Sequence, residues 1–231
     1  MIPRASFVIP AYNAERWLSK TIFSCRQQTV KTIEIIVVND GSTDDTRAIV
    51  DFHAKADDRV IPVHLDNNVG RSEARNIGND KARSEVILVL DADDMATPNR
   101  VKETLAAFEA KKADLVYGSF WVIDSMGNAV RKIICNPFDP IISKEKKLNF
   151  ICHSTVAYTK KLAKEIRYES GDYARLGLDD WKLQWDAFKK GFVIKNIRSP
   201  LAFYRVSDGT VSSTRNEEEV SKVKDEFLAT V

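Results

Sequence analysis

The first 97 residues alternate short apolar segments with amphipathic ones, and this alternation limits the possible folds more than any other feature. The apolar segments predict four strands, at residues 6–9, 33–38, 60–65 and 86–90. The stretches between them carry helical periodicity. Residues 33–38 are β-branched apart from Glu34, which is typical of a strand covered on both faces. Such a βαβαβαβ order predicts a mostly parallel sheet with right-handed crossovers.

Beyond Thr97 the pattern is less regular. Thr97 resembles an N-cap, with Pro98 at the first position of a helix that extends to residue 111. Pro137 and Pro140 predict a loop. We expect further strands at 115–123, in the segment that returns after the turn at 125–128 and ends at 134, and at 154–158. Further helices are expected at 180–190 and 216–229. We expect both halves of the chain to share one sheet.

The composition restricts the class of protein. A chain of 231 residues with 44% hydrophobic and 29% charged residues can bury the core of one α/β domain or two small ones. The net charge of +2 predicts neither nucleic-acid binding nor a strongly acidic partner. Cys25, Cys135 and Cys152 lack a CxxC spacing, so we expect reduced thiols in a cytosolic protein.

We expect a cytoplasmic protein, because a predicted strand follows residues 1–4 at once and leaves no room for a signal peptide. Apolar runs stay well short of the roughly 20 residues that span a bilayer. The basic stretch at 144–147 and the terminal helix leave peripheral contact with the inner face of the membrane open. An ordinary solvated face is the favoured alternative for both segments.

Polar residues follow each of the four strands. Ligands of open parallel sheets bind beyond the carboxyl ends of the strands, so these residues are expected to meet. Each group alone is also explained as a plain turn, but four at one edge predict a ligand site. The groups are Pro10, Ala11, Tyr12 and Asn13; Asn39, Asp40, Gly41 and Ser42; Asp66 to Arg71; and Asp91, Ala92, Asp93 and Asp94.

The last group places three carboxylates within four positions. Like charges this close repel each other, and a shared metal ion is the usual compensation. A solvated acidic loop that caps the next helix is the alternative. If the site is real, Tyr12 could stack on a nucleotide base, Asp40 could accept a hydrogen bond from it, and Arg71 and Arg75 could meet phosphate. Arg75 could equally be a surface helix residue.

Other nucleotide-binding folds are not indicated. No GxGxxG follows the first strand, and the chain contains neither GxxxxGK[ST] nor GxSxG. Phosphate would therefore have to be bound by a metal ion and arginines. A nucleotide diphosphate with Mg²⁺ or Mn²⁺ fits these residues.

Four segments resemble motifs of the family 2 glycosyltransferases: residues 10–13, 36–44, 68–78 and 90–94. The match keeps the family's order and spacing over the first hundred residues and continues, more weakly, to about Ser213. The resemblance implies a GT-A fold, a Rossmann-like, mostly parallel sheet flanked by helices with a smaller irregular acceptor-side half. It also implies a nucleotide-sugar donor, a divalent metal and inversion at the anomeric carbon.

On this resemblance we expect a single domain over residues 1–231. It would comprise a nucleotide-sugar-binding half at 1–118, an acceptor-side half at 119–213 and a terminal amphipathic helix at 214–231.

The resemblance also assigns roles in donor binding. Arg71 would approach the nucleotide, and Asp91, with Ala92 beside it, would face the ribose. Asp93 fills the last position of the DxD motif and would ligate Mn²⁺ or Mg²⁺, a Lewis acid for the leaving diphosphate. Asp94 would belong only to the start of the next helix. The donor base is assigned to Pro10, Ala11, Tyr12 and Asp40.

An inverting displacement needs a base for the acceptor hydroxyl. Residues 178–183, Leu-Asp-Asp-Trp-Lys-Leu, resemble the family's acidic pair before an aromatic helix. Asp180 would be the base, ionised by the helix dipole, with Asp179 in place of a frequent Glu. Ordinary helix caps are the alternative for both aspartates. Trp181 and Trp185 would line the acceptor cleft or, at i,i+4 spacing, belong to the core.

Two further segments resemble family motifs near the acceptor and the diphosphate. His153 begins one of them, although a lone histidine is often structural. The other, at 201–207, often carries a histidine where this chain has Ser207. Metal binding is therefore expected to be weaker or completed by water, and Arg205 is expected to contact the diphosphate.

These features predict an inverting glycosyltransferase for polysaccharide biosynthesis. It would transfer a sugar from a nucleotide diphosphate, expected to be UDP, to a hydroxyl of a glycan or lipid-linked acceptor. A sugar nucleotidyltransferase is a weaker alternative, because residues 10–13 are not a glycine- and lysine-rich loop. A non-catalytic nucleotide-sugar-binding module is the third possibility.

Overall fold

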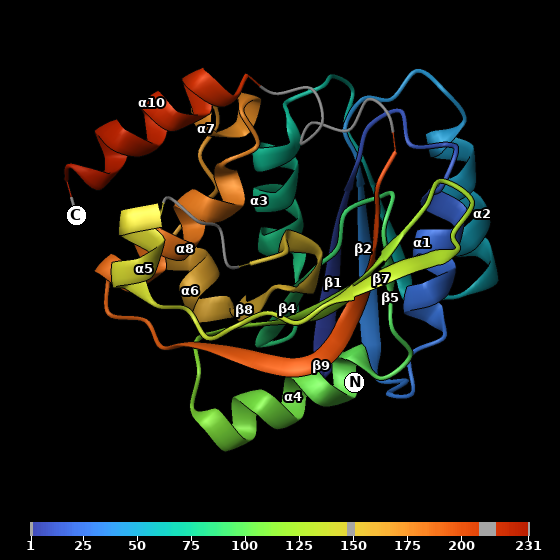
Figure 1. Cartoon of the computed structure of the whole chain (residues 1–231). Coiled ribbons are helices and arrows are strands. Elements are labelled where there is room, and N and C mark those ends of the chain that lie inside the picture. The colour runs from blue at the N-terminus through green and yellow to red at the C-terminus, as the bar shows by residue number, and fades with distance from the viewer. Residues whose placement is uncertain (1, 147–150, 208–215, 231) are drawn as a thin grey trace.

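The computed structural model describes residues 2–146, 151–207 and 216–230. In these residues one sheet contains nine strands in the order β3-β2-β1-β4-β8-β6-β9-β5, with β7 paired to β6 (Figure 1). The predicted α/β fold with a sheet flanked by helices is confirmed; the sheet is parallel in the first half of the chain and mixed in the second. The strands are β1 (Ala5–Ala11), β2 (Ile33–Asn39), β3 (Val60–His64), β4 (Val86–Val89), β5 (Met95–Ala96), β6 (Leu115–Ile123), β7 (Ala129–Ile133), β8 (Ala157–Thr159) and β9 (Ile194–Arg205).

The four strands of the first half run parallel, so their carboxyl ends meet at one edge. Val8 of β1 is opposite Ile36 of β2 and Val89 of β4. The short strand β8 then pairs antiparallel with both β4 and β6, while β9 runs parallel to β6. Through β8 the sheet continues from the first half into the second, as expected from the sequence.

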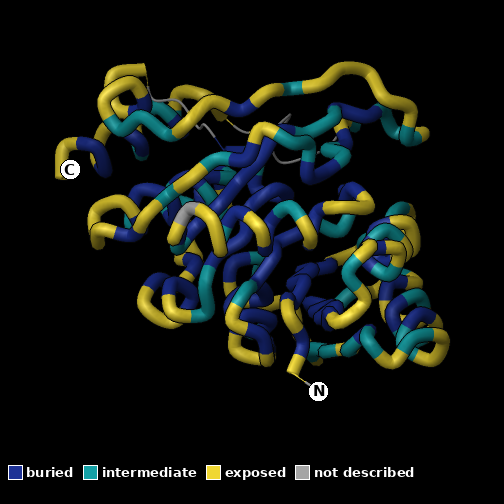
Figure 2. The backbone as a smooth tube through the Cα atoms, turned by 90° about the horizontal axis from the view of Figure 1, so that it is seen from below, coloured by how far each residue is buried: buried dark blue, intermediate teal, exposed yellow. Residues whose placement is uncertain are grey.

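Helices cover both faces of the sheet, because successive side chains of a strand point to opposite sides. Phe7 and Ile9 pack with α1 (Leu18–Arg26), α2 (Thr46–Ala56) and α4 (Arg100–Lys111). Val8 packs with α3 (Arg71–Lys81), α6 (Lys160–Glu165) and α8 (Asp179–Lys189). The strands between these layers are the buried centre of the molecule (Figure 2). The remaining elements are α5 (Pro140–Lys146), a 3₁₀ turn (His153–Thr155), α7 (Asp172–Arg175) and α10 (Glu217–Leu228).

Helix α3 lies directly against the sheet because Gly78 has no side chain. A Cβ at this position would come within 2.4 Å of Val8 Cγ1. This close approach fixes the position of α3, whose first turns carry Arg71 and Arg75 toward the carboxyl ends of the strands.

The predicted start of α4 is wrong by two residues, since the helix begins at Arg100 rather than at Pro98. Thr97 is held by the sheet instead: its N–H donates to Leu201 O (3.1 Å) and its hydroxyl to Pro200 O (3.0 Å). Asp94 does not belong to the helix start either. It is fully buried, and it accepts a hydrogen bond from Arg205 N (2.7 Å), which joins the acidic turn to β9.

The prediction of a loop at Pro140 is also wrong, because α5 begins at that residue. The sequence did contain a helix-start signal at this point. Asp139 accepts hydrogen bonds from the N–H groups of Ile141 (2.9 Å) and Ile142 (3.1 Å), so an N-cap aspartate precedes a proline at the first helical position. Strand β9 was not predicted, although its last residues belong to the family motif at 201–207.

The predicted terminal helix is present as α10, which lies beside α7 and α8 (Figure 1). Residues 208–215, which include Ser213, and residue 147 of the basic stretch lie outside the described residues. In the part of the chain that the structure describes, no helix combines the length and hydrophobicity that crossing a bilayer requires.

Candidate active site

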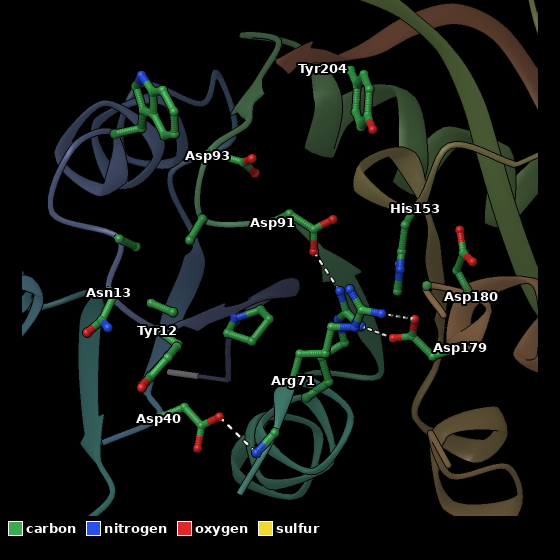
Figure 3. Close-up of a pocket in the computed structure, with 18 of the residues that line it drawn as sticks. Tyr12, Asn13, Asp40, Arg71, Asp91, Asp93, His153, Asp179, Asp180 and Tyr204 are labelled. Atoms are coloured by element: carbon green, nitrogen blue, oxygen red, sulfur yellow. Dashed lines mark hydrogen bonds and ion pairs between the residues drawn. The ribbon is translucent and has the colours of Figure 1, made fainter. Parts of the chain in front are cut away.

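A cavity of about 910 Å³ opens at the carboxyl ends of β1, β2 and β4 and extends to the start of α8 (Figure 3). The structure brings almost all of the predicted site residues to its wall, from both halves of the chain. They are Pro10, Ala11, Tyr12, Asp40, Arg71, Asp91, Ala92, Asp93, His153, Asp179 and Asp180.

One side of the cavity is formed by the loops that follow β1 and β2. Asp40 N donates to Ala11 O (2.8 Å), and the Asp40 carboxylate accepts from Val69 N (2.7 Å) and Gly70 N (3.0 Å). Asp40 thus joins three loops of the sheet edge. The ring of Tyr12 lies near Asp40 and is about half exposed, at 51%, so its face is accessible to a planar ligand (Figure 3).

Gly41 allows two of these loops to approach each other. It has a φ of +67°, and a Cβ there would lie 2.6 Å from backbone atoms of Asn67 and Asn68. A side chain at this position would push the loops apart and alter the wall beside Asp40.

The three carboxylates after β4 have three different environments. Asp91 lies 2.7 Å from Arg75 Nη2; burial opposes its ionisation, but the charge and hydrogen bond of Arg75 outweigh burial and lower the pKa of Asp91 to about 2. Asp94 is buried, and desolvation together with Asp93 and Asp91 raises its pKa well above the ordinary range. Asp93 points into the cavity (Figure 3), and burial together with the charge of Asp91 raises its pKa to about 6.

Asp93 fits the metal that the family resemblance implies. An ionised Asp93 is disfavoured by burial and by Asp91, so a cation beside it would relieve both. No group of three or more metal-binding side chains occurs among the residues described. Mg²⁺ is commonly held by one or two carboxylates, with phosphate oxygens and water as its other ligands. A single carboxylate that points into the cavity (Figure 3) suits that kind of site.

Two arginines of α3, Arg71 and Arg75, line the cavity. Arg75, which is only 4% exposed, forms ion pairs with Asp91 and with Asp179. Arg71 donates to Ala174 O and lies 3.4 Å from Asp179 Oδ1. The surface alternative for Arg75 is therefore wrong. Its partners lie 16 and 104 positions away in the sequence, so helical periodicity could not have identified them.

Asp180 stands on the opposite side of the cavity from Asp93 (Figure 3). It occupies the first turn of α8, and its Oδ1 accepts a hydrogen bond from Trp181 N (2.7 Å). Leu178 is the N-cap residue, so neither aspartate occupies the cap position. The helix terminus favours the ionised carboxylate.

His153 is buried beside Asp180 (Figure 3). Its Nε2 lies 2.9 Å from the Tyr168 hydroxyl, and the two rings stack with centroids 5.4 Å apart. Burial and the nearby charge of Arg75 lower the pKa of His153, which favours a neutral imidazole.

Two predicted site residues do not reach the cavity wall. Trp181 is fully buried and packs on Trp185 and Phe227, which corresponds to the core alternative. Arg205 is 1% exposed; its Nε donates to Asp93 O (2.8 Å) and its Nη1 to Asp124 O (2.8 Å). Arg205 thus supports the backbone of the acidic turn from behind, while Ser207 reaches the cavity.

Three aromatic side chains on the wall were not identified from the sequence: Trp17, Phe120 and Tyr204. The rings of Phe120 and Tyr204 meet edge to face at 5.7 Å, and Trp17 Nε1 donates to Ser125 O (3.3 Å). Aromatic residues in strands and helices are ordinary core residues, so their sequence positions carried no functional signal.

Residues 6–167 match the model of the glycosyl transferase family 2. The match covers more than half of the chain, which therefore belongs to this family. The family predicted from the strand-end motifs is confirmed, and its membership supports the predicted enzyme class.

Curated relatives include two named bacterial glycosyltransferases. The glycosyltransferase GlyG of Streptococcus pneumoniae is 36% identical over 53% of this chain and 41% of its own length. WfaP of Escherichia coli, named a UDP-Glc:α-D-GlcNAc-diphosphoundecaprenol β-1,3-glucosyltransferase, is 28% identical over 92% of this chain and 81% of its own. The chain thus spans less than half of GlyG but most of WfaP.

Among solved structures, Staphylococcus aureus TarS 1-349 in complex with UDP-GlcNAc superposes with a TM-score of 0.76 at 19% identity. The alignment covers 98% of this chain and 66% of TarS 1-349. This similarity confirms the predicted GT-A fold.

Proposed function

We propose that this chain is an inverting glycosyltransferase that transfers a sugar from a UDP-sugar to a hydroxyl of a glycan or lipid-linked acceptor. The observation that carries the proposal is one cavity that holds the strand-end residues of the first half on one side and Asp180 on the other. A nucleotide-sugar would lie against the strand ends, with its reactive carbon toward α8.

Donor binding is proposed at the wall formed by Pro10, Ala11, Tyr12 and Asp40. Tyr12 offers an exposed aromatic face for the base, and base stacking on an aromatic ring contributes about 1–3 kcal/mol. The names of WfaP and of the TarS complex, which contain UDP-Glc and UDP-GlcNAc, support UDP as the nucleotide. Ala92 and Asp91 would face the ribose.

Asp93 would hold a Mn²⁺ or Mg²⁺ ion on the diphosphate side. When bound, the ion would act as a Lewis acid that stabilises the negative charge of the leaving diphosphate. Arg205 would keep the Asp93 backbone in place through its bond to Asp93 O, and Arg71 would add positive charge at the same wall.

Asp180 would accept the proton of the acceptor hydroxyl as that oxygen attacks the anomeric carbon from the face opposite the diphosphate. Its place across the cavity from Asp93 supports this direction of attack (Figure 3). The Trp181 N–H and the helix terminus favour its ionised form. The name of WfaP, with a diphosphoundecaprenol acceptor, supports a lipid-linked acceptor for this chain as well.

The test is UDP release from UDP-Glc and from UDP-GlcNAc in the presence of Mn²⁺, with and without EDTA. We expect release from at least one donor, raised by a bacterial lipid-linked glycan fraction and lost with EDTA. Pyrophosphate release from UTP and a sugar 1-phosphate would instead indicate a nucleotidyltransferase. Donor binding without turnover would indicate a binding module.

A further inference from the structure

We infer that Arg75 is a positioning residue that ties the acidic turn after β4 to the start of α8 and so holds Asp180 opposite Asp93. Asp179 is the anchor of this bridge, and Asp180 alone is the base. The inference rests on the proposed glycosyl transfer.

One guanidinium group joins three elements at this point. Arg75 belongs to α3; its Nη2 lies 2.7 Å from Asp91 Oδ1, and its Nη1 donates to Asp179 Oδ2. The Tyr168 ring lies 5.4 Å from the guanidinium carbon and covers it. Arg75 thereby connects the donor side of the cavity with the acceptor side.

Arg75 projects from a helix that is itself held firmly on the sheet, and it reaches the first turn of α8 through Asp179. Helix α3 is fixed on the sheet by the close contact of Gly78 with Val8. The N-cap of α8, Leu178, provides no side-chain hydrogen bond to the helix, so a capping bond does not hold its first turn. The ion pairs of Asp179 with Arg75 and Arg71 tie this turn to α3, while the bond from Leu178 N to Tyr173 O (2.7 Å) ties it only to the preceding segment.

Because of this pairing, the two neighbouring aspartates of α8 have different environments. Asp179 is 5% exposed and faces two guanidinium groups, so its carboxylate oxygens are already engaged. Asp180 is rotated by about 100° around the helix, is less buried and lines the cavity beside His153 (Figure 3). Because the residues are adjacent in one helix, whatever fixes Asp179 also fixes the direction of Asp180.

The variant Arg75→Lys tests the bridge. Lysine keeps the positive charge, but its single ammonium group cannot reproduce the planar fork that meets two carboxylates. We expect kcat for UDP release from the better of UDP-Glc and UDP-GlcNAc to fall about 100-fold, as for a catalytic group displaced by about 1 Å. The Kd for UDP with Mn²⁺ should stay within about threefold, since the guanidinium of Arg75 is already paired with Asp91 and Asp179.

The matched control is Arg167→Lys. Arg167 also pairs with a carboxylate of α3, Asp80, through two hydrogen bonds, but it is exposed and does not line the cavity. Its kcat should equal that of the wild type. Circular dichroism of both variants reports on folding.

Asp179→Asn and Asp180→Asn then separate the anchor from the base. Asp179→Asn should lower kcat while keeping the acidic limb of the pH–rate profile, because the base is still present. Asp180→Asn should abolish transfer while keeping the Kd for UDP, because the base is lost and the donor wall is unchanged. These variants also test the bridge if Arg75→Lys does not fold, since Asp179→Asn removes only its α8 end.

Three results would overturn the inference while glycosyl transfer stands: wild-type kcat in a folded Arg75→Lys, a rise in its Kd for UDP that accounts for the loss, or disappearance of the acidic limb in Asp179→Asn. If the wild type releases no UDP from either donor, the proposed function itself fails, and this inference fails with it.

Discussion

Two arginine–aspartate clusters lie at opposite edges of the sheet. At the carboxyl ends of the strands, one arginine, Arg75, is shared by two carboxylates, Asp91 and Asp179. At the amino ends, one carboxylate, Asp57, is shared by Arg26 and Arg59, at 2.9 Å and 2.7 Å. We call them the site cluster and the opposite-edge cluster.

The difference lies in the balance of charge. In the opposite-edge cluster the carboxylate is fully matched, and hydrogen bonds from Arg59 lower the pKa of Asp57 below its ordinary range. The cavity wall at the site cluster instead carries five aspartates and two arginines among the residues described. Such an acidic excess is unfavourable unless a cation joins it, so in the proposed mechanism the same ion-pair chemistry would support the fold at one edge and a ligand site at the other.

The largest expected effect is that of Asp93→Asn, which removes the proposed metal ligand but keeps the shape of the side chain. Loss of Lewis-acid stabilisation worth several kcal/mol should lower kcat/KM by about 10³-fold or more. EDTA should then cause no further loss, and the melting temperature should not fall. Metal-dependent turnover close to that of the wild type would remove Asp93 from the proposed mechanism and with it the contrast between the two edges.

A smaller effect is expected from Tyr12→Ala, which acts on the uncharged part of the same wall. Loss of base stacking should weaken binding of UDP by about 1–3 kcal/mol, or roughly 5- to 150-fold in Kd. Isothermal titration with UDP and Mn²⁺ measures it. Tyr12→Phe is the matched control, because it keeps the ring and should bind as the wild type does. Equal binding by Tyr12→Ala would place the base elsewhere.

The donor side of the site could be predicted because it depends on local sequence. Each strand of the first half ends in a short polar segment, and parallel strands bring such segments together whatever the details of packing. Tyr12, Asp40 and Asp93 were found in this way. The family resemblance added Asp180, whose acidic pair carries little information by itself.

The remaining features depend on contacts between distant parts of the chain. Arg75 acquires its role from Asp179, which lies 104 positions away, and Asp94 from Arg205, which lies 111 positions away. The start of α4 was misplaced for the same reason, since Thr97 is bound by β9 instead of capping the helix. No periodicity within either segment encodes these partners.

The opposite-edge cluster offers the prediction with the smallest effect on activity. In Asp57→Asn, three guanidinium hydrogen bonds to a charged acceptor are weakened, so the free energy of unfolding at neutral pH should fall by about 1–3 kcal/mol. The kcat should not change below the melting temperature, because the cluster is distant from the cavity. Chemical denaturation and UDP release measure the two quantities on the same sample.

The direction of the Asp57 pKa shift predicts how this stability difference depends on pH. The pKa of Asp57 is lowered from its ordinary value of 3.8, mainly by hydrogen bonds from Arg59, so its stabilising contribution is complete above that value and is lost as the pH falls through the lower, folded-state pKa. The stability difference between wild type and Asp57→Asn should therefore be constant at neutral pH and shrink in acid. A loss of kcat in Asp57→Asn comparable to that of Asp93→Asn would show that the two edges are coupled, and the division between a supporting cluster and a site cluster would not hold.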